Sequence, residues 1–407
     1  MATSFALTNA TVVTADAAGT VHRDWTIAVD AAGTISHAGP STSIGLAPGL
    51  ARIDAGGRFV LPGLINAHAH LFADGTLLPP FYTKPATVDL VARFLRSFAG
   101  RLVLRRRTRA NLATQLRSGV TTLRSVGDVA YEVVEARTEI EAGRLVGPRV
   151  LASGPLMAIT GGHGAPTIAL ICDTPAQARA NTRSSRRAGV TAIKIAATAG
   201  VSDAKEVGYA GRPEMPEESM RVICQEAHEA GVLVAAHAQS ADGVAAALRA
   251  GVDTIEHGSA MNEEIIGLFL DNPASLRGSS ALIPTMQAAL PLTKLPIEDT
   301  GADPVVRANA ELIVEEMLTG IRTAMEHGIR MGVGTDSAVS FVTHSNFWRT
   351  VSVGRTPRST GSRRSTLCWT ASSRPGRRRD PRRPCATALS AWPRRSATTS
   401  CPGPSPR

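Results

Sequence analysis

Strand-like and helix-like segments alternate along the chain from residue 61 onward, and this alternation restricts the fold more than any other feature. Eight apolar, strand-like runs lie at residues 61–71, 119–127, 148–154, 189–200, 231–240, 251–259, 281–287 and 328–337. The segments between them have helical composition, and several end in glycine, a common helix terminator. Eight alternating units predict an α/β fold with a (β/α)₈ TIM barrel. The alternative, a doubly wound open sheet, is disfavoured because no glycine-rich dinucleotide motif follows the first run.

The first 60 residues have a different pattern. They contain short runs rich in Thr, Val and Ile that are interrupted by Asp and Gly, which predicts a small β unit. We therefore expect a small β unit at residues 1–60, the barrel at residues 61–345 and a segment of another kind at residues 346–407.

The formal net charge of +10 would suit a nucleic-acid-binding protein, but its distribution argues against one. Residues 345–407 hold 14 Arg and a single acid, Asp380, whereas the rest of the chain holds 30 basic and 33 acidic residues. We therefore expect no nucleic-acid partner. No run reaches the roughly 18 to 20 apolar residues of a membrane helix, and the N-terminus has no signal-type core. We expect a soluble, cytoplasmic protein with no membrane partner.

Side chains that can bind metals collect at the carboxyl ends of the strand-like runs. They are His68 and His70 in the first run, Lys194 in the fourth, His237 in the fifth, His257 in the sixth and Asp336 in the eighth. In a TIM barrel these ends converge on the face that carries active sites. Imidazole, carboxylate and a modified lysine could together bind a divalent ion there.

Each of these residues also has an ordinary explanation. A lone histidine at a strand end is more often a hydrogen-bonded rim residue than a ligand, and Asp336 alone could cap a helix. Lys194 is harder to explain, because a lysine inside a buried strand is unfavourable unless it is paired or chemically altered. Suitable residues at five strand ends favour one shared site over five coincidences.

The order of seven short motifs adds a further constraint. LPGLINAHAHL, GVTTLRSVG, SGPLMAITGGHG, IKIAATAG, AAHA, IEHG and GVGTDS follow one another along the chain. This ordered set closely resembles the amidohydrolase superfamily. The nearest branch contains Xaa-Pro dipeptidases, carboxypeptidase-like members, ochratoxin-type amidases and imidazolonepropionase-like proteins. The resemblance covers about residues 5–345.

The resemblance implies a centre with two divalent metal ions, with zinc as the first choice. One ion would be held by His68, His70 and Asp336, and the other by His237 and His257. Lys194, carbamylated by CO₂, would bridge the ions together with a hydroxide. The implied reaction is hydrolysis of an amide or peptide-like C–N bond, in which the hydroxide attacks and Asp336 passes the proton to the leaving amine.

Three further residues match family positions near the substrate. His163, in TGGHG, matches a loop histidine that faces the substrate and is also a catalytic candidate, although it could equally be a hydrogen-bonded loop residue. Tyr209 lies beyond the fourth run, and His344 lies beyond the eighth. The His344 match is weaker, because Ser345 follows where the family usually has glycine. The expected partner is a small-molecule or dipeptide-like substrate, and a homo-oligomer is consistent with the family.

The resemblance stops near residue 346, where an Arg-, Pro- and Ser-rich segment begins. Disorder and a basic nucleic-acid arm are two explanations, and we favour a third, a frameshift. Codons read one base early must give Leu across Cys368 and Trp369, Asp across Trp369 and Thr370, and Ala across Trp392 and Pro393, which fits the missing family segment. The resemblance implies a small β-sandwich whose N-terminal part is residues 1–60, and we then expect the last helix and the C-terminal half of this sandwich to be lost.

Two other functions remain open. The first is a mononuclear deaminase or an imidazolonepropionase-type cyclic amidohydrolase, against which Lys194 argues because such sites usually lack a bridging lysine. The second is a non-catalytic or inactivated relative with a damaged C-terminus, against which the complete set of ligands argues. The sequence does not identify the substrate, since specificity depends on the loops after the strands.

Overall fold

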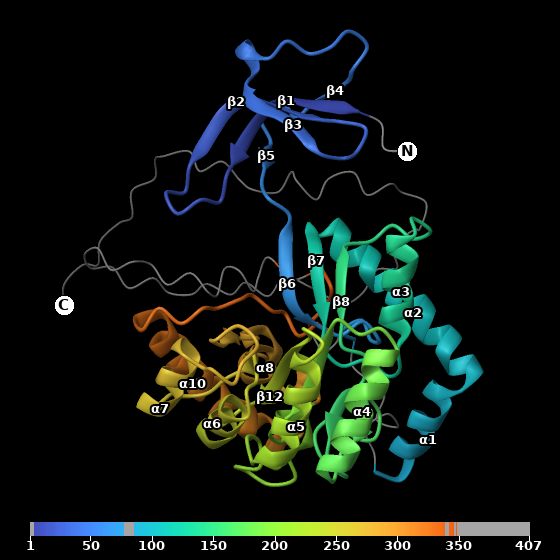
Figure 1. Ribbon diagram of the computed structural model, residues 1–407, viewed down its shortest axis with the longest axis vertical. Coiled ribbons are helices and arrows are strands. Elements are labelled where there is room, and N and C mark those ends of the chain that lie inside the picture. Colours follow the sequence, from blue (N-terminus) through green and yellow to red (C-terminus); the bar gives the residue numbers. More distant parts are fainter. Residues whose placement is uncertain (1–3, 77–84, 338–341, 346, 348–407) are drawn as a thin grey trace, which may run out of the picture. The chain divides into compact units, whose positions relative to one another are not determined.

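The computed structural model describes residues 4–76, 85–337, 342–345 and 347 (Figure 1). Among these residues, no helix is both long and apolar enough to cross a membrane. Almost all of the predicted Arg-, Pro- and Ser-rich tail, namely residue 346 and residues 348–407, lies outside the described residues.

Five strands near the N-terminus form one sheet: β1 (Phe5–Val13), β2 (Val21–Val29), β3 (Ile35–Pro40), β4 (Ala51–Asp54) and β5 (Phe59–Val60). Their order is β3-β2-β1-β4, and β5 pairs with the later part of β1. Between β1 and β2 the chain turns where Asp16 accepts hydrogen bonds from the backbone and hydroxyl of Thr20, a typical role of aspartate in turns. The predicted N-terminal β unit is thus confirmed as a sheet, while its place in a sandwich stays a prediction.

The strands that follow are parallel and belong to two sheets. β6 (Leu64–Ala69), β7 (Val120–Ser125) and β8 (Arg149–Ala152) form the first sheet in chain order. The second contains β11 (Ala192–Ala196), β12 (Leu233–Ala238), β13 (Thr254–His257) and β14 (Ala281–Ile283), again in chain order. Each of these seven strands lies within one of the predicted strand-like runs.

Backbone hydrogen bonds join the two sheets into a ring. The Thr191 amide, just before β11, donates to the Ala152 carbonyl of β8 at 2.8 Å. On the other side, residues 330–337 act as the eighth strand. The Gly332 amide donates to Leu282 of β14 at 2.9 Å, and the Ala67 amide of β6 donates to Val333 at 2.8 Å. The closed ring of eight parallel segments is consistent with the predicted TIM barrel.

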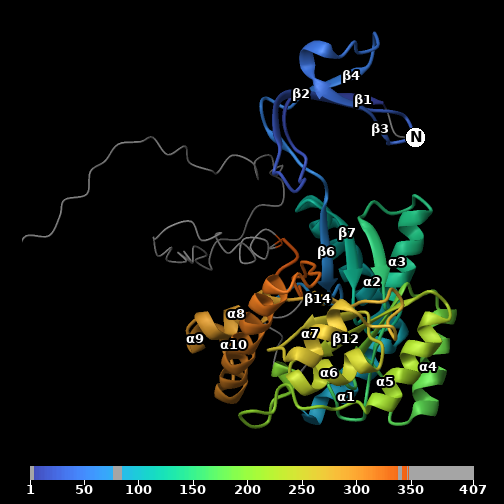
Figure 2. The same cartoon turned by 60° about the vertical axis from the view of Figure 1, so that its left-hand side comes forward.

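Helices follow the strands and lie around the outside of the sheets (Figure 1, Figure 2). They are α1 (Pro85–Arg96), α2 (Phe98–Arg117), α3 (Glu132–Glu141), α4 (Pro175–Arg187), α5 (Glu217–His228), α6 (Ala241–Arg249), α7 (Glu263–Leu270), α8 (Met286–Lys294), α9 (Ile297–Thr300) and α10 (Pro304–Glu326). Several start at residues that suit a helix N-terminus. Thr174 and Gln177 form a capping box at α4, and the Ser240 hydroxyl accepts from the Gly243 amide at α6.

Two short strands were not predicted. β9 (Leu156–Ala158) and β10 (Ala169–Ile171) pair in parallel, and β9 meets β11 only at Met157 and Ile195. Because β8 hydrogen-bonds to the segment before β11, β9 and β10 are not part of the ring. They lie in the connection between β8 and β11. The same connection contains the loop with His163.

Candidate metal centre

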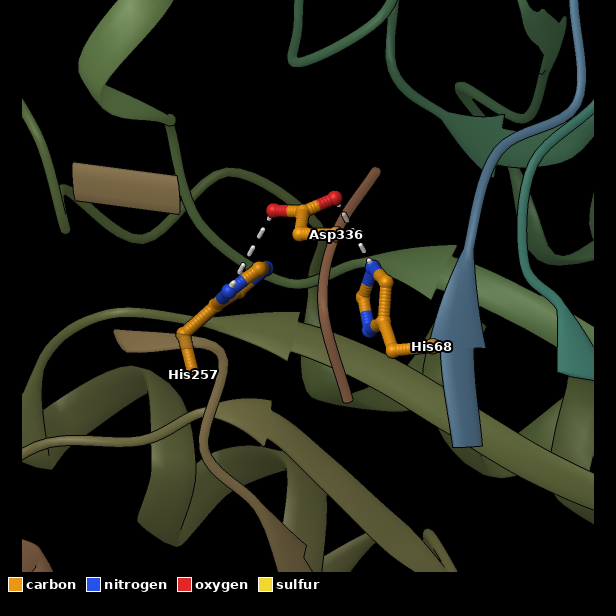
Figure 3. Close-up of side chains that lie close together, drawn as sticks. All are labelled: His68, His257 and Asp336. Atoms are coloured by element: carbon orange, nitrogen blue, oxygen red, sulfur yellow. Dashed lines mark ion pairs between the residues drawn. The ribbon is translucent and has the colours of Figure 1, made fainter. Parts of the chain in front are cut away.

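The carboxyl ends of three barrel segments bring His68, His257 and Asp336 together (Figure 3). Each offers one potential ligand atom, and these atoms all lie within 4.8 Å of one another. His68 Nε2 is 3.3 Å from Asp336 Oδ1, and His257 Nδ1 is 4.0 Å from Asp336 Oδ2. All three side chains are buried. A buried group of two imidazoles and a carboxylate is a set that divalent transition metals prefer.

His70 joins this group from the same strand as His68, as the alternation of strand side chains predicts. Its Nε2 lies 3.0 Å from Asp336 Oδ1, while its Nδ1 lies 2.9 Å from the Gly127 carbonyl and donates to it. The donation to Gly127 leaves Nε2 as the ring nitrogen that faces Asp336. The predicted first set, His68, His70 and Asp336, is therefore brought together.

Two of these residues have an unusual backbone conformation. His257 has φ 72° and Asp336 has φ 55°, in the left-handed region that residues other than glycine rarely adopt. Both residues come at the end of a barrel segment, where regular alternation is broken. Such strain is typical of functional sites, where the surrounding structure holds a side chain in a required direction.

His237 lies beside His257, with 4.6 Å between their ring centroids. Burial lowers the pKa of both histidines well below the ordinary value, and the neighbouring His163 lowers that of His237 further. Both rings are therefore neutral near pH 7 and keep a lone pair for a metal. Burial alone would raise the pKa of Asp336, but His68 and His70 hold it well below the ordinary value, so this carboxylate is ionised.

Lys194 lies in β11 and is 2% exposed. Its Nζ has no hydrogen-bond partner among the described residues. Burial lowers the pKa of Lys194 from 10.5 to about 8, although Glu256 and Asp336 favour the charged form. A buried amine without a partner is unfavourable, and this is the feature that made Lys194 a candidate in the sequence.

A buried ion pair next to the cluster was not predicted. Arg124 of β7 donates from Nη2 to Glu256 Oε1 at 2.6 Å, and the other oxygen, Oε2, lies 2.6 Å from His68 Nδ1. Both residues stand inside quoted strand motifs, GVTTLRSVG and IEHG. Each is a charged residue within a strand, the feature that also distinguishes Lys194 in the sequence.

His163 lies next to the cluster, with its ring stacked on that of His237 at a centroid distance of 4.0 Å. Its Nδ1 is hydrogen-bonded to Asp203, and its backbone amide donates to Glu214 at 2.8 Å. Burial alone would lower the pKa of His163, but the Asp203 carboxylate raises it above the ordinary value. Asp203 and Glu214 had no recognisable signal in the sequence, because their partner is distant along the chain.

The two other substrate-contact candidates differ from each other. Tyr209 is partly exposed and lines a pocket of about 320 Å³ together with Arg212, Ser240 and Asp242. His344 is buried, and both of its ring nitrogens are engaged: Gln115 lies 3.0 Å from Nδ1, and Nε2 donates to the Ala73 carbonyl at 2.8 Å. His344 thus has no free nitrogen for a substrate in this arrangement.

The fold is a parallel β/α barrel, and a cluster of histidine and aspartate lies at the carboxyl ends of its strands. This combination is typical of barrel enzymes that bind metal ions. The sequence model of the amidohydrolase family matches residues 59–362. The structure of a candidate prolidase from Bifidobacterium longum is 46% identical, with a TM-score of 0.74, and the match covers 87% of this chain and 78% of that one. The chain belongs to the amidohydrolase family, as the motifs predicted.

More distant relatives support the same fold. A Xaa-Pro dipeptidase with methionine in its active site is 24% identical with a TM-score of 0.70, covering 86% of this chain and 83% of that one. Ochratoxinase from Aspergillus niger is 24% identical over 304 residues, which are 69% of this chain and 58% of the relative. The chain thus spans less than two thirds of the length of ochratoxinase.

Proposed function

We propose that this chain is a metal-dependent hydrolase that cleaves an amide or peptide-like C–N bond. The convergence of His68, His257 and Asp336 from three barrel segments is the observation that carries the proposal. Family membership supports it, since the motifs that supply these residues are the ones that resemble amidohydrolases.

The donor set fits two divalent ions, and we propose zinc. His68, His70 and Asp336 would hold one ion, and His237 and His257 would hold the other. Neutral buried imidazoles and an ionised carboxylate suit zinc. When bound, such ions polarise a carbonyl and make water a nucleophile near neutral pH.

Lys194 fits this centre only after modification. With a pKa of about 8, part of the amine is neutral near pH 7 and can attack CO₂. The new N–C bond gives a carbamate and releases one proton. The product replaces a buried amine that has no partner among the described residues by an anionic oxygen donor, the kind of ligand that a divalent ion accepts. We propose this carbamate as the bridge.

Asp336 and His163 would handle protons and substrate. Asp336 is an ionised carboxylate among the ligands, so it can take a proton from the attacking water and give it to the leaving amine. The Asp203 carboxylate favours the protonated form of His163. A protonated His163 beside His237 would attract an anionic group of the substrate, and we propose Tyr209 as a second contact.

We propose a dipeptide or an N-acyl amino acid as the substrate. A prolidase structure that contains N-methylphosphonate-L-proline is 24% identical to this chain with a TM-score of 0.67. That ligand and the methionine of the Xaa-Pro dipeptidase are small, amino-acid-like molecules. Ligands of this size and polarity suit a site whose identified residues are charged and hydrogen-bonding.

Metal content and hydrolysis test the proposal together. Protein purified with zinc should hold about two ions per chain by elemental analysis and should hydrolyse members of a panel of dipeptides and N-acyl amino acids. Asp336→Asn and Lys194→Ala should each abolish hydrolysis, whereas Lys294→Ala, at an exposed lysine of α8, should not. Full activity of Asp336→Asn, or protein that holds no metal, would refute the function.

One observation favours a second candidate, a mononuclear amidohydrolase. The closest group of possible ligand atoms among the described residues comprises three residues, His68, His257 and Asp336, which would suffice for one ion. One ion per chain, with activity retained in Lys194→Ala, would establish this alternative and exclude the bridged centre.

A further inference from the structure

Arg124 and Glu256 reach each other through the inside of the barrel. Arg124 lies on β7, and Glu256 lies on β13, four strands further around the ring. Their side chains are 11% and 0% exposed. The pair therefore spans the barrel interior directly beside the metal centre and away from water.

Both carboxylate oxygens of Glu256 have hydrogen-bond partners. Oε1 accepts from Arg124 at 2.6 Å and from the Thr254 hydroxyl at 2.7 Å, and Oε2 lies 2.6 Å from His68 Nδ1. The guanidinium of Arg124 makes an ion pair with this buried carboxylate at 2.6 Å. An ionised carboxylate only accepts hydrogen bonds, so Nδ1 of His68 must carry the hydrogen.

The tautomer of His68 determines where its lone pair points. Because Nδ1 of His68 is held by Glu256, Nε2 is the ring nitrogen left for an ion, and it lies 3.3 Å from Asp336 Oδ1. A carboxylate behind a metal-binding histidine also fixes the ring orientation and makes it a better donor.

Arg124 contacts the backbone of the same strand. Its Nε donates to the Ala67 carbonyl at 2.7 Å, immediately before His68, and its Nη1 donates to the Thr254 hydroxyl at 2.9 Å. One guanidinium thus holds both the carboxylate that orients His68 and the backbone from which His68 extends. The planar, five-donor shape of arginine suits this double role, and lysine could not replace it.

We propose that Arg124 and Glu256 are positioning residues of the metal centre, which fix His68 as an Nε2 donor toward one of the two ions. The role of His68 as a zinc ligand rests on the proposed function, whereas the tautomer of its ring does not. Neither residue touches the substrate or an ion. The competing explanation is a purely structural ion pair, which would stabilise the barrel without affecting metal affinity.

The tautomer of His68 can be measured without metal or activity. In ¹⁵N-labelled, metal-free protein, long-range ¹H–¹⁵N spectra should show the His68 ring with its hydrogen on Nδ1, assigned by loss of the signal in His68→Gln. In Glu256→Gln the ring should shift toward a mixture of tautomers, because an amide does not impose an accepting partner. A wild-type ring without a hydrogen on Nδ1 would overturn the proposal.

Metal affinity provides the second measurement. Glu256→Gln should weaken the binding of one zinc ion by about 10- to 100-fold and leave the other much less affected. Arg124→Gln/Glu256→Gln removes both buried charges, so it should recover thermal stability relative to Glu256→Gln but not zinc affinity. Recovery of both, or unchanged affinity in Glu256→Gln, would show that the pair is purely structural.

A matched control exists on the outer helices. Arg183 of α4 donates to both oxygens of Glu226 of α5, at 2.9 and 2.8 Å, outside the barrel interior. Arg183→Gln/Glu226→Gln should leave zinc affinity and the His68 spectrum unchanged. If wild-type protein binds no zinc, the proposed function fails, while the spectrum of the metal-free protein still decides the orientation of His68.

Discussion

Lys194 is the residue at which folding and the proposed chemistry conflict most directly. A buried ammonium with no hydrogen-bond partner among the described residues opposes folding, and the lowered pKa of about 8 measures this opposition. An unfolded lysine binds its proton up to pH 10.5, whereas the folded protein releases it near pH 8. Between these values the unfolded state holds more protons, so stability of the metal-free protein rises with pH.

We therefore predict that Lys194→Met stabilises the metal-free protein. The free energy of unfolding should increase by up to about 3 kcal/mol at pH 7, and the gain should disappear as pH approaches 10.5. Urea unfolding at pH 7 and pH 10, in buffer free of CO₂, measures both values. Lys294→Met, at an exposed lysine, is the control and should show no such pH dependence. A wild-type protein at least as stable as Lys194→Met at pH 7 would contradict the prediction.

The sequence reveals some residues of the site better than others. His68, His70 and Asp336 were recognisable because strand ends converge in a barrel, and the structure brings them together. Arg124 and Glu256 each stand out as charged residues in a strand, but their pairing has no signature, because a cross-barrel ion pair joins residues 132 positions apart. The positive φ of His257, the last residue of β13, also has no signature in a single sequence.

At the scale of elements, α10 packs unusually closely against the end of β13. A Cβ atom on Gly320 of α10 would lie 2.1 Å from the carbonyl oxygen of Ser259, two residues after His257. We predict that Gly320→Ala displaces α10 or the 258–260 segment and destabilises the protein by about 1 to 3 kcal/mol. It should also weaken zinc binding, because the displaced segment adjoins His257. Chemical unfolding and zinc titration measure the two effects.

Gly267 of α7 is the matched control. It is also a helical glycine, but a Cβ atom there would meet no heavy atom within 4 Å. Gly267→Ala should therefore stabilise the protein by about 0.5 to 1 kcal/mol, through the lower entropy of the unfolded chain, with zinc binding unchanged. If Gly320→Ala and Gly267→Ala changed the free energy of unfolding in the same direction, close packing at Ser259 would not restrict α10.

Alternation of strand-like and helix-like segments was sufficient to predict the barrel but not its irregularities. Buried strands such as β11 and β12 are apolar except for Lys194 and His237, and such runs are easily recognised. The eighth segment was also recognised, yet it joins its neighbours through isolated bridges at Met331 and Ser337. β9 and β10 contain three residues each, too few for a periodic pattern, and were missed.

At the scale of the whole molecule, the division at residues 60 and 345 and the frameshift after it stay predictions, because almost all of residues 346–407 lie outside the described residues. Independent sequencing of the gene should show one base more or fewer before the codon of Cys368. An unchanged reading frame, together with peptides from residues 346–407 in a mass-spectrometric digest, would refute the frameshift.

Metal binding should also stabilise the whole barrel, because the proposed ligands come from strands on opposite sides of the ring. His68 and Asp336 lie on adjoining segments, whereas His237 lies on β12, across the interior. We predict that a chelator lowers the thermal midpoint and that zinc restores it. A ligand at 1,000 times its dissociation constant stabilises the folded state by about 4 kcal/mol.

The midpoint should therefore rise with the logarithm of the free zinc concentration, without a plateau, once the centre is saturated in the folded state. Differential scanning calorimetry across zinc buffers measures this slope. Asp336→Asn/His257→Gln removes two of the three clustered residues His68, His257 and Asp336, so the slope should fall strongly. Arg183→Gln/Glu226→Gln should shift the midpoint but keep the wild-type slope. An equal response of all three proteins to zinc would mean that the ions bind elsewhere, because Asp336→Asn/His257→Gln has lost two of the proposed ligands.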